Sequence, residues 1–139
     1  MVKIFVYGTL RQGMYNYDIY LKDEKSFREY AYLKGSLYII QGKAYPAYLT
    51  KGNQYILGEI HEVSEEKAKE LDEMEGYHGE NHESNEYHRI LCPIYNEQHE
   101  VITSMPVYVY NTDNINNAPI GECIESGDFV SYVKAHKGL

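Results

Sequence analysis

The hydrophobic residues of this chain gather in short runs separated by glycine, asparagine and proline, a pattern typical of a domain rich in strands. The first run, Val2–Tyr7, ends at Gly8 and predicts a buried strand that leads into a turn. Four later runs predict further strands, over residues 30–40, 54–63, 86–95 and 101–110. Gly58 interrupts the second of these, where a glycine indicates a bulge or the close approach of another backbone segment.

Residues 64–76 have the pattern of a helix. Ser64 suits the N-cap, the acidic residues after it suit the positive end of the helix dipole, and Gly76 suits the position beyond the C-terminus. A second helical pattern, over residues 128–136, is shorter and is expected to pack on the sheet. The sequence therefore predicts a mainly β fold with one main helix and a short C-terminal helix.

The rest of the sequence shows no repeat, no low-complexity tract and no linker. A chain of 139 residues has the usual size of one domain, so we expect residues 1–139 to form a single domain. The polar stretches 78–86 and 111–118 predict surface loops.

Charge and composition narrow the class of partner. The formal net charge of −8 opposes binding to nucleic acid and to anionic membranes. No run approaches the ~20 apolar residues of a membrane span, and the first residues lack the apolar stretch of a signal peptide, so we expect a cytoplasmic protein. Cys92 and Cys123 lie outside any C-x-x-C pattern, so we expect free thiols. The 16 tyrosines, in the absence of tryptophan, favour an interior or pocket lined by hydroxyl groups.

A carboxylate breaks the amphipathic pattern of the main predicted helix. On a helical wheel the apolar face is formed by Ala68, Leu71 and Met74. Glu75 falls between Ala68 and Leu71 on that same face. A carboxylate held there needs hydrogen-bond donors or a raised pKa, and either property suits a general base. The alternative is that the last helical turn opens before Gly76 and exposes Glu75 to water.

A second candidate is the turn after the first strand, which reads Tyr7-Gly8-Thr9-Leu10-Arg11-Gln12-Gly13. Backbone N–H groups exposed in such a glycine-flanked turn form a concave site for an anion or a carbonyl oxygen. The segment matches neither the phosphate-binding loop nor the dinucleotide-binding pattern, so nucleotide binding is not predicted. An ordinary turn after a strand has a similar sequence, and the residues alone leave both interpretations open.

The histidines suggest a third site, in which His78 and His82, followed by Glu83 and His88, bind a divalent metal. Their spacing is not H-E-x-x-H, and Gly79 and Asn81 oppose the helix that would bring two imidazoles onto one face. We therefore expect a solvated loop, with no metal and no other cofactor.

Tyr87 and Arg89 stand two residues apart at the start of a predicted strand and therefore share one face. If this face points inward, a phenol and a guanidinium join the pocket. If it points outward, they form an ordinary surface pair, and the residues alone favour neither arrangement.

Several segments together make the chain resemble the γ-glutamylcyclotransferase family. They are, in order, Val6–Leu10, Tyr45-Pro46, Gly58-Glu59-Ile60, Leu71–Gly76, Tyr87-His88-Arg89 and Val107–Tyr110. The resemblance covers nearly the whole chain and is greatest for the γ-glutamylamine cyclotransferase and AIG2-like branch, whose short members begin with this Tyr-Gly-Thr-Leu turn. Near the end, Ser126–Phe129 has phenylalanine where the family has the tryptophan of a Gly-Asp-Trp motif.

The resemblance implies an α+β fold, a small and mostly antiparallel β-barrel with one main helix packed beside it and a short C-terminal helix. It implies that Glu75 is the catalytic acid/base and that the substrate is held by Tyr7, Gly8, Thr9 and Leu10. From the other segments that carry the resemblance we add, as expected substrate-binding residues, Tyr87, Arg89 and Tyr108.

The implied function is the conversion of a γ-glutamyl amine or γ-glutamyl amino acid to 5-oxoproline and free amine, a transferase or lyase type of intramolecular cyclisation. The α-amine of the substrate attacks its own γ-carbonyl, and a base removes the proton from that amine. The identity of the leaving amine and the oligomeric state stay open. A non-catalytic protein that binds a small metabolite on the same fold is the alternative, because a fold alone does not determine function.

Overall fold

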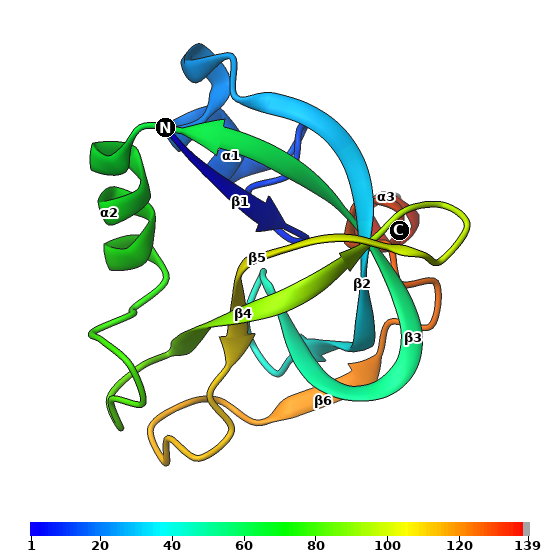
Figure 1. Cartoon of the computed structure of the whole chain (residues 1–139). Coiled ribbons are helices and arrows are strands. Elements are labelled where there is room, and N and C mark those ends of the chain that lie inside the picture. The colour runs from blue at the N-terminus through cyan, green and yellow to red at the C-terminus, as the bar shows by residue number, and fades with distance from the viewer. Residues whose placement is uncertain (138–139) are drawn as a thin grey trace.

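The structure, a computed structural model that describes residues 1–137, is built around one curled sheet (Figure 1). Its elements are, in chain order, β1 (Val2–Val6), α1 (Tyr15–Tyr20), the short 3-10 helix η1 (Lys22–Glu24), β2 (Phe27–Ile40), β3 (Pro46–Val63), α2 (Glu65–Met74), β4 (Tyr87–Tyr95), β5 (Val101–Tyr110), β6 (Ile120–Cys123) and α3 (Phe129–Lys137). No helix within the described residues is long and apolar enough to cross a membrane.

The strand pairs are antiparallel and follow the order β1-β3-β2-β4-β5, with β6 paired to β2. This confirms the predicted α+β fold with a mostly antiparallel sheet, one main helix and a short C-terminal helix. The sheet of the predicted barrel is curled and not closed: β1 and β5 lie against each other but form no hydrogen-bonded ladder within residues 1–137. β1 has only 5 residues, and a side chain bridges the seam instead, with the Tyr7 hydroxyl donating to the Tyr108 carbonyl at 2.7 Å.

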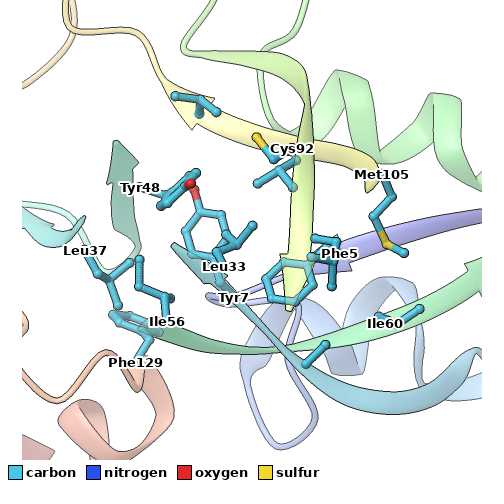
Figure 2. Close-up of a cluster of buried hydrophobic side chains, with 14 of the residues drawn as sticks. Phe5, Tyr7, Leu33, Leu37, Tyr48, Ile56, Ile60, Cys92, Met105 and Phe129 are labelled. Atoms are coloured by element: carbon cyan, nitrogen blue, oxygen red, sulfur yellow. The ribbon is translucent and has the colours of Figure 1, made fainter. Parts of the chain in front are cut away.

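The hydrophobic core lies inside the curl of the sheet (Figure 2). Phe5 of β1, Leu33 of β2 and Ile56 of β3 are almost fully buried there. Phe129 joins the same cluster and is buried, so it fixes α3 to the core as predicted for the C-terminal helix. The burial of this aromatic side chain shows that phenylalanine fills this position of the core.

Gly58 lets β1 approach β3 closely. A Cβ atom at this position would lie 2.3 Å from Cζ of Phe5 and 2.4 Å from the carbonyl oxygen of Val6. The pairing of Ala31 with Gly58 continues the regular register on either side, so the glycine serves a close approach and not a bulge. The end of β1, and the turn after it, therefore lie close over β3.

The helix α2 begins and ends where the sequence predicts. The Ser64 hydroxyl accepts a hydrogen bond from the Lys67 N–H at 3.0 Å, and Leu71 is fully buried. Glu75 occupies the C-cap and its N–H donates to the Leu71 carbonyl at 2.9 Å, so the last turn stays closed. Gly76 follows with φ of 66°, the left-handed conformation that a glycine adopts without strain.

The two predicted polar loops are tied to each other by asparagine side chains. Asn85 is fully buried; its side chain accepts from the His78 N–H at 2.6 Å and donates to the Gly79 carbonyl at 2.8 Å. The Asn111 amide in turn donates to the Asn85 carbonyl at 2.9 Å. These bonds fix the course of the chain between α2 and β4.

Candidate active site

A small cavity, with a volume of about 30 Å³, lies where β1, α2, β4 and β5 converge with the beginning of β3. It is lined by Phe5, Val6, Tyr7, Gly8, Thr9, Leu10, Tyr45, Pro46, Glu75, Tyr87 and Tyr108. All but one of the residues expected to act in catalysis or substrate binding line this cavity, although they come from distant parts of the chain. The exception is Arg89.

Glu75 contributes the acidic group of the cavity. Its side chain is partly buried at the end of α2 and faces the lining residues. The pKa of Glu75 is raised to about 8. Burial is the largest cause, and the neighbouring carboxylates of Glu86 and Asp72 contribute the rest. The carboxyl group is therefore mostly neutral at pH 7 and gains its charge within one or two pH units of neutrality.

Three buried phenols shape the cavity wall. The Tyr7 hydroxyl donates to the Tyr108 carbonyl at 2.7 Å, the Tyr87 hydroxyl to the Pro46 carbonyl at 2.6 Å, and the Tyr108 hydroxyl to Asp72 Oδ1 at 2.6 Å. Burial raises the pKa of each phenol above its ordinary value, so all three stay protonated. Because each proton is already donated to a protein acceptor, these hydroxyls hold the wall of the cavity in place.

The turn after β1 contributes backbone donors. Within the described residues, no acceptor takes the N–H group of Gly8, Thr9 or Leu10. Thr9 is fixed from the other side, since its hydroxyl accepts from the Asn16 amide at 2.8 Å. A Cβ at Gly8 would lie 2.9 Å from the Pro46 ring, so only glycine fits against this wall. The turn therefore presents free donors on a restrained backbone, as an anion or oxyanion site requires.

Glu86 is a part of the site that sequence reasoning missed. Its N–H donates to the Gly76 carbonyl at 3.0 Å, and its carboxylate accepts from the Tyr45 hydroxyl at 2.6 Å. These contacts place a second carboxylate beside Glu75 and connect it to a residue of the cavity lining. Tyr45 and Glu86 are 41 residues apart in the chain, and no local pattern predicts their pairing.

Arg89 lies outside the cavity. Its guanidinium is exposed, pairs with the Asp72 carboxylate and lies 4.7 Å from the centre of the Tyr77 ring. Tyr87 lines the cavity. Arg89 stands on the same face of β4 but pairs with Asp72 of α2 and stays exposed, so the two side chains have different surroundings. Arg89 contacts the site through Asp72, which also accepts from Tyr108.

The histidine cluster has no metal-binding arrangement within residues 1–137, where no three His, Cys, Asp or Glu side chains gather as ligands. The rings of His78 and His82 lie 5.4 Å apart, and His82 Nδ1 accepts from the Ser84 N–H at 3.1 Å. Cys92 is buried and Cys123 exposed, and both are free.

Comparison with known proteins agrees with this geometry. The model of the γ-glutamyl cyclotransferase, AIG2-like family matches residues 4–131. A γ-L-glutamyl-butirosin B γ-glutamyl cyclotransferase from Niallia circulans is 40% identical over 114 residues, which are 82% of this chain and 70% of that protein. An AIG2-like protein from Mus musculus superposes with a TM-score of 0.60 at 27% identity, over 91% of this chain and 89% of that one.

A further likeness concerns the fold alone. An uncharacterized protein from Pyrococcus horikoshii superposes with a TM-score of 0.69 at 24% identity, over 99% of this chain and 98% of that one. The family match and the sequence relative go further, because they favour cyclotransferase catalysis over the non-catalytic alternative. This chain belongs to the AIG2-like γ-glutamyl cyclotransferase family.

Proposed function

We propose that this cyclotransferase converts a γ-glutamyl amine or γ-glutamyl amino acid to 5-oxoproline and the free amine, with Glu75 as its acid/base. The observation that carries the proposal is the placement of one carboxyl group with a pKa of about 8 opposite a turn of free backbone donors in a single cavity. The sequence relative from Niallia circulans, which is named for a γ-glutamyl compound, supports this class of substrate.

The first step is a proton transfer. The α-amine of a γ-glutamyl group is protonated near neutral pH and cannot attack until it loses that proton. Ionised Glu75 accepts the proton, and the free amine then attacks the γ-carbonyl carbon of the same molecule. A base with a pKa near the working pH is well matched to this task, and such catalysis contributes about 10²–10⁴-fold in rate.

The second step returns the proton. Attack forms a five-membered tetrahedral intermediate whose carbonyl oxygen has become an oxyanion. The ring nitrogen of this intermediate carries an extra proton and a positive charge. The proton held by Glu75 passes to the nitrogen of the departing amine, the C–N bond to that amine breaks, and the carbonyl forms again. Glu75, ionised once more, takes the extra proton from the ring nitrogen and gives it to the released amine, which leaves as an ammonium ion. The 5-oxoproline that remains has a neutral ring amide, and Glu75 returns to its ionised form. Proton and charge balance without a metal, a nucleotide or a covalent enzyme intermediate.

The turn of Gly8, Thr9 and Leu10 binds the negative oxygens of the substrate in this proposal. Its free N–H groups suit either the α-carboxylate or the oxyanion, and removal of one oxyanion donor costs about 10²–10³-fold in rate in other enzymes. In this proposal the cavity lined by the turn and by Glu75 holds the glutamyl chain in a curled shape. A wall that closes on a curled glutamyl chain adds rate through orientation.

The test measures 5-oxoproline release from γ-glutamyl amines, γ-glutamyl amino acids and γ-glutamyl-ε-lysine. We expect release by the wild type and a loss of about 10²–10⁴-fold in kcat for Glu75→Gln, which keeps the shape of the side chain but not its basicity. The matched control is Glu73→Gln, which removes the same charge from an exposed position on α2 and should leave kcat unchanged. Full activity of Glu75→Gln would refute the assignment of the base, and no release from any substrate by the wild type would refute the reaction.

A further inference from the structure

A chain of buried polar side chains lies beneath the turn after β1, and the cyclisation chemistry does not use it. Arg11, Glu59, His61 and Ser26 are 5%, 1%, 0% and 1% exposed. None of them lines the cavity. Burying such groups is costly unless each is paired, so a cluster this complete requires an explanation.

Glu59 is the centre of this cluster. Its Oε1 accepts from the backbone N–H of Gln12 at 3.0 Å, and its Oε2 accepts from Arg11 Nε at 3.2 Å. Oε1 also lies 2.9 Å from His61 Nε2, while His61 Nδ1 lies 2.8 Å from the Ser26 hydroxyl. A carboxylate accepts and the Ser26 hydroxyl can donate or accept, so the arrangement in which His61 Nε2 donates to Glu59 satisfies both ring nitrogens. One carboxylate on β3 thus holds two consecutive residues of the turn, Arg11 and Gln12. The carboxylate is itself held by His61, which the Ser26 hydroxyl holds in turn.

Arg11 extends the cluster to the C-terminal helix. Its Nη1 donates to Asp128 Oδ1 at 2.8 Å, so one guanidinium bridges the carboxylates of Glu59 and Asp128. Asp128 also accepts from the Ser131 N–H at 3.1 Å at the start of α3. The planar fork of arginine suits two carboxylates at once, which the single ammonium of lysine does not. The Arg11 side chain therefore connects the turn to β3 and to the start of α3.

We propose that Arg11, Glu59 and His61 are positioning residues that hold the Gly8–Leu10 turn in the shape in which its N–H groups meet the substrate. This inference rests on the proposed role of the turn in binding γ-glutamyl oxygens. Gly8, Thr9 and Leu10 line the cavity, and within the described residues no acceptor takes their N–H groups. The residues that follow, Arg11 and Gln12, are held by Glu59. A displacement of 1 Å in such donors costs about 10²-fold in rate, so a fixed backbone has a direct effect on catalysis.

The kinetic test compares Glu59→Gln with Ile94→Val, a control in the fully buried core of β4. The glutamine still accepts from Gln12 but removes the charge that faces Arg11. We expect kcat/KM to fall about 10–100-fold in Glu59→Gln, with the pH at which the rate levels unchanged because Glu75 is untouched. Ile94→Val should lose stability and keep kcat/KM. Arg11→Lys, which keeps the charge and loses the bridge, should fall by a smaller factor, about 3–10-fold.

A measurement that does not depend on activity separates this inference from the proposed function. Backbone ¹⁵N order parameters of Gly8, Thr9 and Leu10 should fall from about 0.85 toward 0.6 in Glu59→Gln and stay unchanged in Ile94→Val. Unchanged order parameters together with unchanged kcat/KM in folded Glu59→Gln would overturn the positioning role. If Glu59→Gln does not fold, Arg11→Lys decides by the same two measurements. A wild type that releases no 5-oxoproline would refute the proposed reaction, and the order parameters would still decide whether the cluster holds the turn.

Discussion

The residue proposed as the acid/base, Glu75, is set apart by its surroundings and not by its type. Glu73 and Glu75 stand two positions apart near the end of α2, yet the first is exposed and the second faces a cavity. Burial and two neighbouring carboxylates raise the pKa of Glu75 to about 8, which makes an ordinary glutamate a base suited to neutral pH. The neighbours of Glu75 are therefore expected to tune the reaction.

The first prediction concerns the pH dependence of turnover. Glu75 accepts a proton only when ionised, so we expect kcat/KM to rise with pH, to reach half of its plateau near pH 8 and to level about one to two pH units above that. Glu86→Gln removes one of the charges that raise the pKa of Glu75, and the rise should move to lower pH. Because all proteins are compared on the same substrate, the titration of the substrate amine is the same for each, and a difference between two profiles reports on the enzyme. Glu83→Gln removes a charge from the same loop at an exposed position, and its profile should match the wild type. Superimposable profiles for all three proteins would contradict the coupling of Glu86 to Glu75.

A second prediction follows for stability. The pKa of Glu75 is raised from 4.5 to about 8 in the fold, so folding favours the neutral form. The stabilising effect of that neutral form is fully present below pH 4.5 and is lost as the pH rises through 8. Glu75→Gln stays neutral, so we expect it to exceed the wild type by about 1–3 kcal/mol in unfolding free energy at pH 9, and to match it near pH 4.5. Urea titrations at the two pH values measure this, with Glu73→Gln as control. A difference that does not change with pH would be evidence against a raised pKa.

At the scale of elements, the end of α2 determines where the carboxylates lie. Gly76 has φ of 66°, and a Cβ there would lie 3.0 Å from Cβ of Glu86. Gly42 has a similar φ of 75° with no atom within 4 Å of the added Cβ. The two glycines therefore share the same backbone requirement and differ in what surrounds them.

The third prediction uses this pair. Gly76→Ala and Gly42→Ala should each lose about 1 kcal/mol of unfolding free energy, because alanine is strained in the left-handed region. Only in Gly76→Ala does the added Cβ also crowd the side chain of Glu86. We therefore expect this substitution alone to lower kcat/KM, by about 10-fold or more. Denaturant titrations and steady-state kinetics on the same preparations test both statements. Equal kinetic effects of the two substitutions would show that contact with Glu86 does not matter.

The sequence predicted the elements with strong periodic patterns and missed those held by tertiary contacts. The five predicted strands and α2 have β-branched runs or clear capping residues. In contrast, α1 has six residues with no side chain capping it, and it is held by contacts such as the Tyr17 N–H to the Thr9 carbonyl at 3.1 Å. Lys51-Gly52-Asn53 has the composition of a turn, yet β3 continues through it because the register with β2 shifts between Gly35 and Ser36.

The residues of the site divide into the same two classes, those that local sequence patterns indicate and those that only tertiary contacts bring together. Glu75 broke a helical pattern, and the turn of Tyr7 to Leu10 followed a clear strand, so local sequence identified both. The pairs Tyr45–Glu86 and Arg11–Glu59 join residues 41 and 48 positions apart. Their side chains are polar residues without a distinctive spacing, and only the fold brings them together. A buried ion pair between distant strands and loops leaves no periodic signal in a single sequence.

At the scale of the whole molecule, the open seam of the sheet lies at the site. β1 and β5 end the strand order and touch without a ladder within the described part of the chain. The Tyr7 hydroxyl joins them by donating to the Tyr108 carbonyl. The strand that carries the donor turn is thus connected to the strand that carries Tyr108 by a side chain and not by the sheet. The relative position of the two walls of the cavity depends on this bond.

The last prediction tests that dependence with two tyrosines whose rings pack 5.6 Å apart. Tyr7→Phe removes the bond across the seam, whereas Tyr48→Phe removes a bond of equal length, 2.7 Å, from the Tyr48 hydroxyl to the Lys34 carbonyl inside the β2–β3 pair. Both substitutions keep the ring and lose one buried hydrogen bond, so each should cost about 1–3 kcal/mol of unfolding free energy. Only Tyr7→Phe frees the two cavity walls to shift, and we expect it alone to lower kcat/KM, by about 10-fold or more. Thermal unfolding with kinetics at a temperature where all proteins are folded measures both effects. If Tyr48→Phe lowers kcat/KM as much as Tyr7→Phe does, general loosening of the core explains the loss, and the seam has no special role.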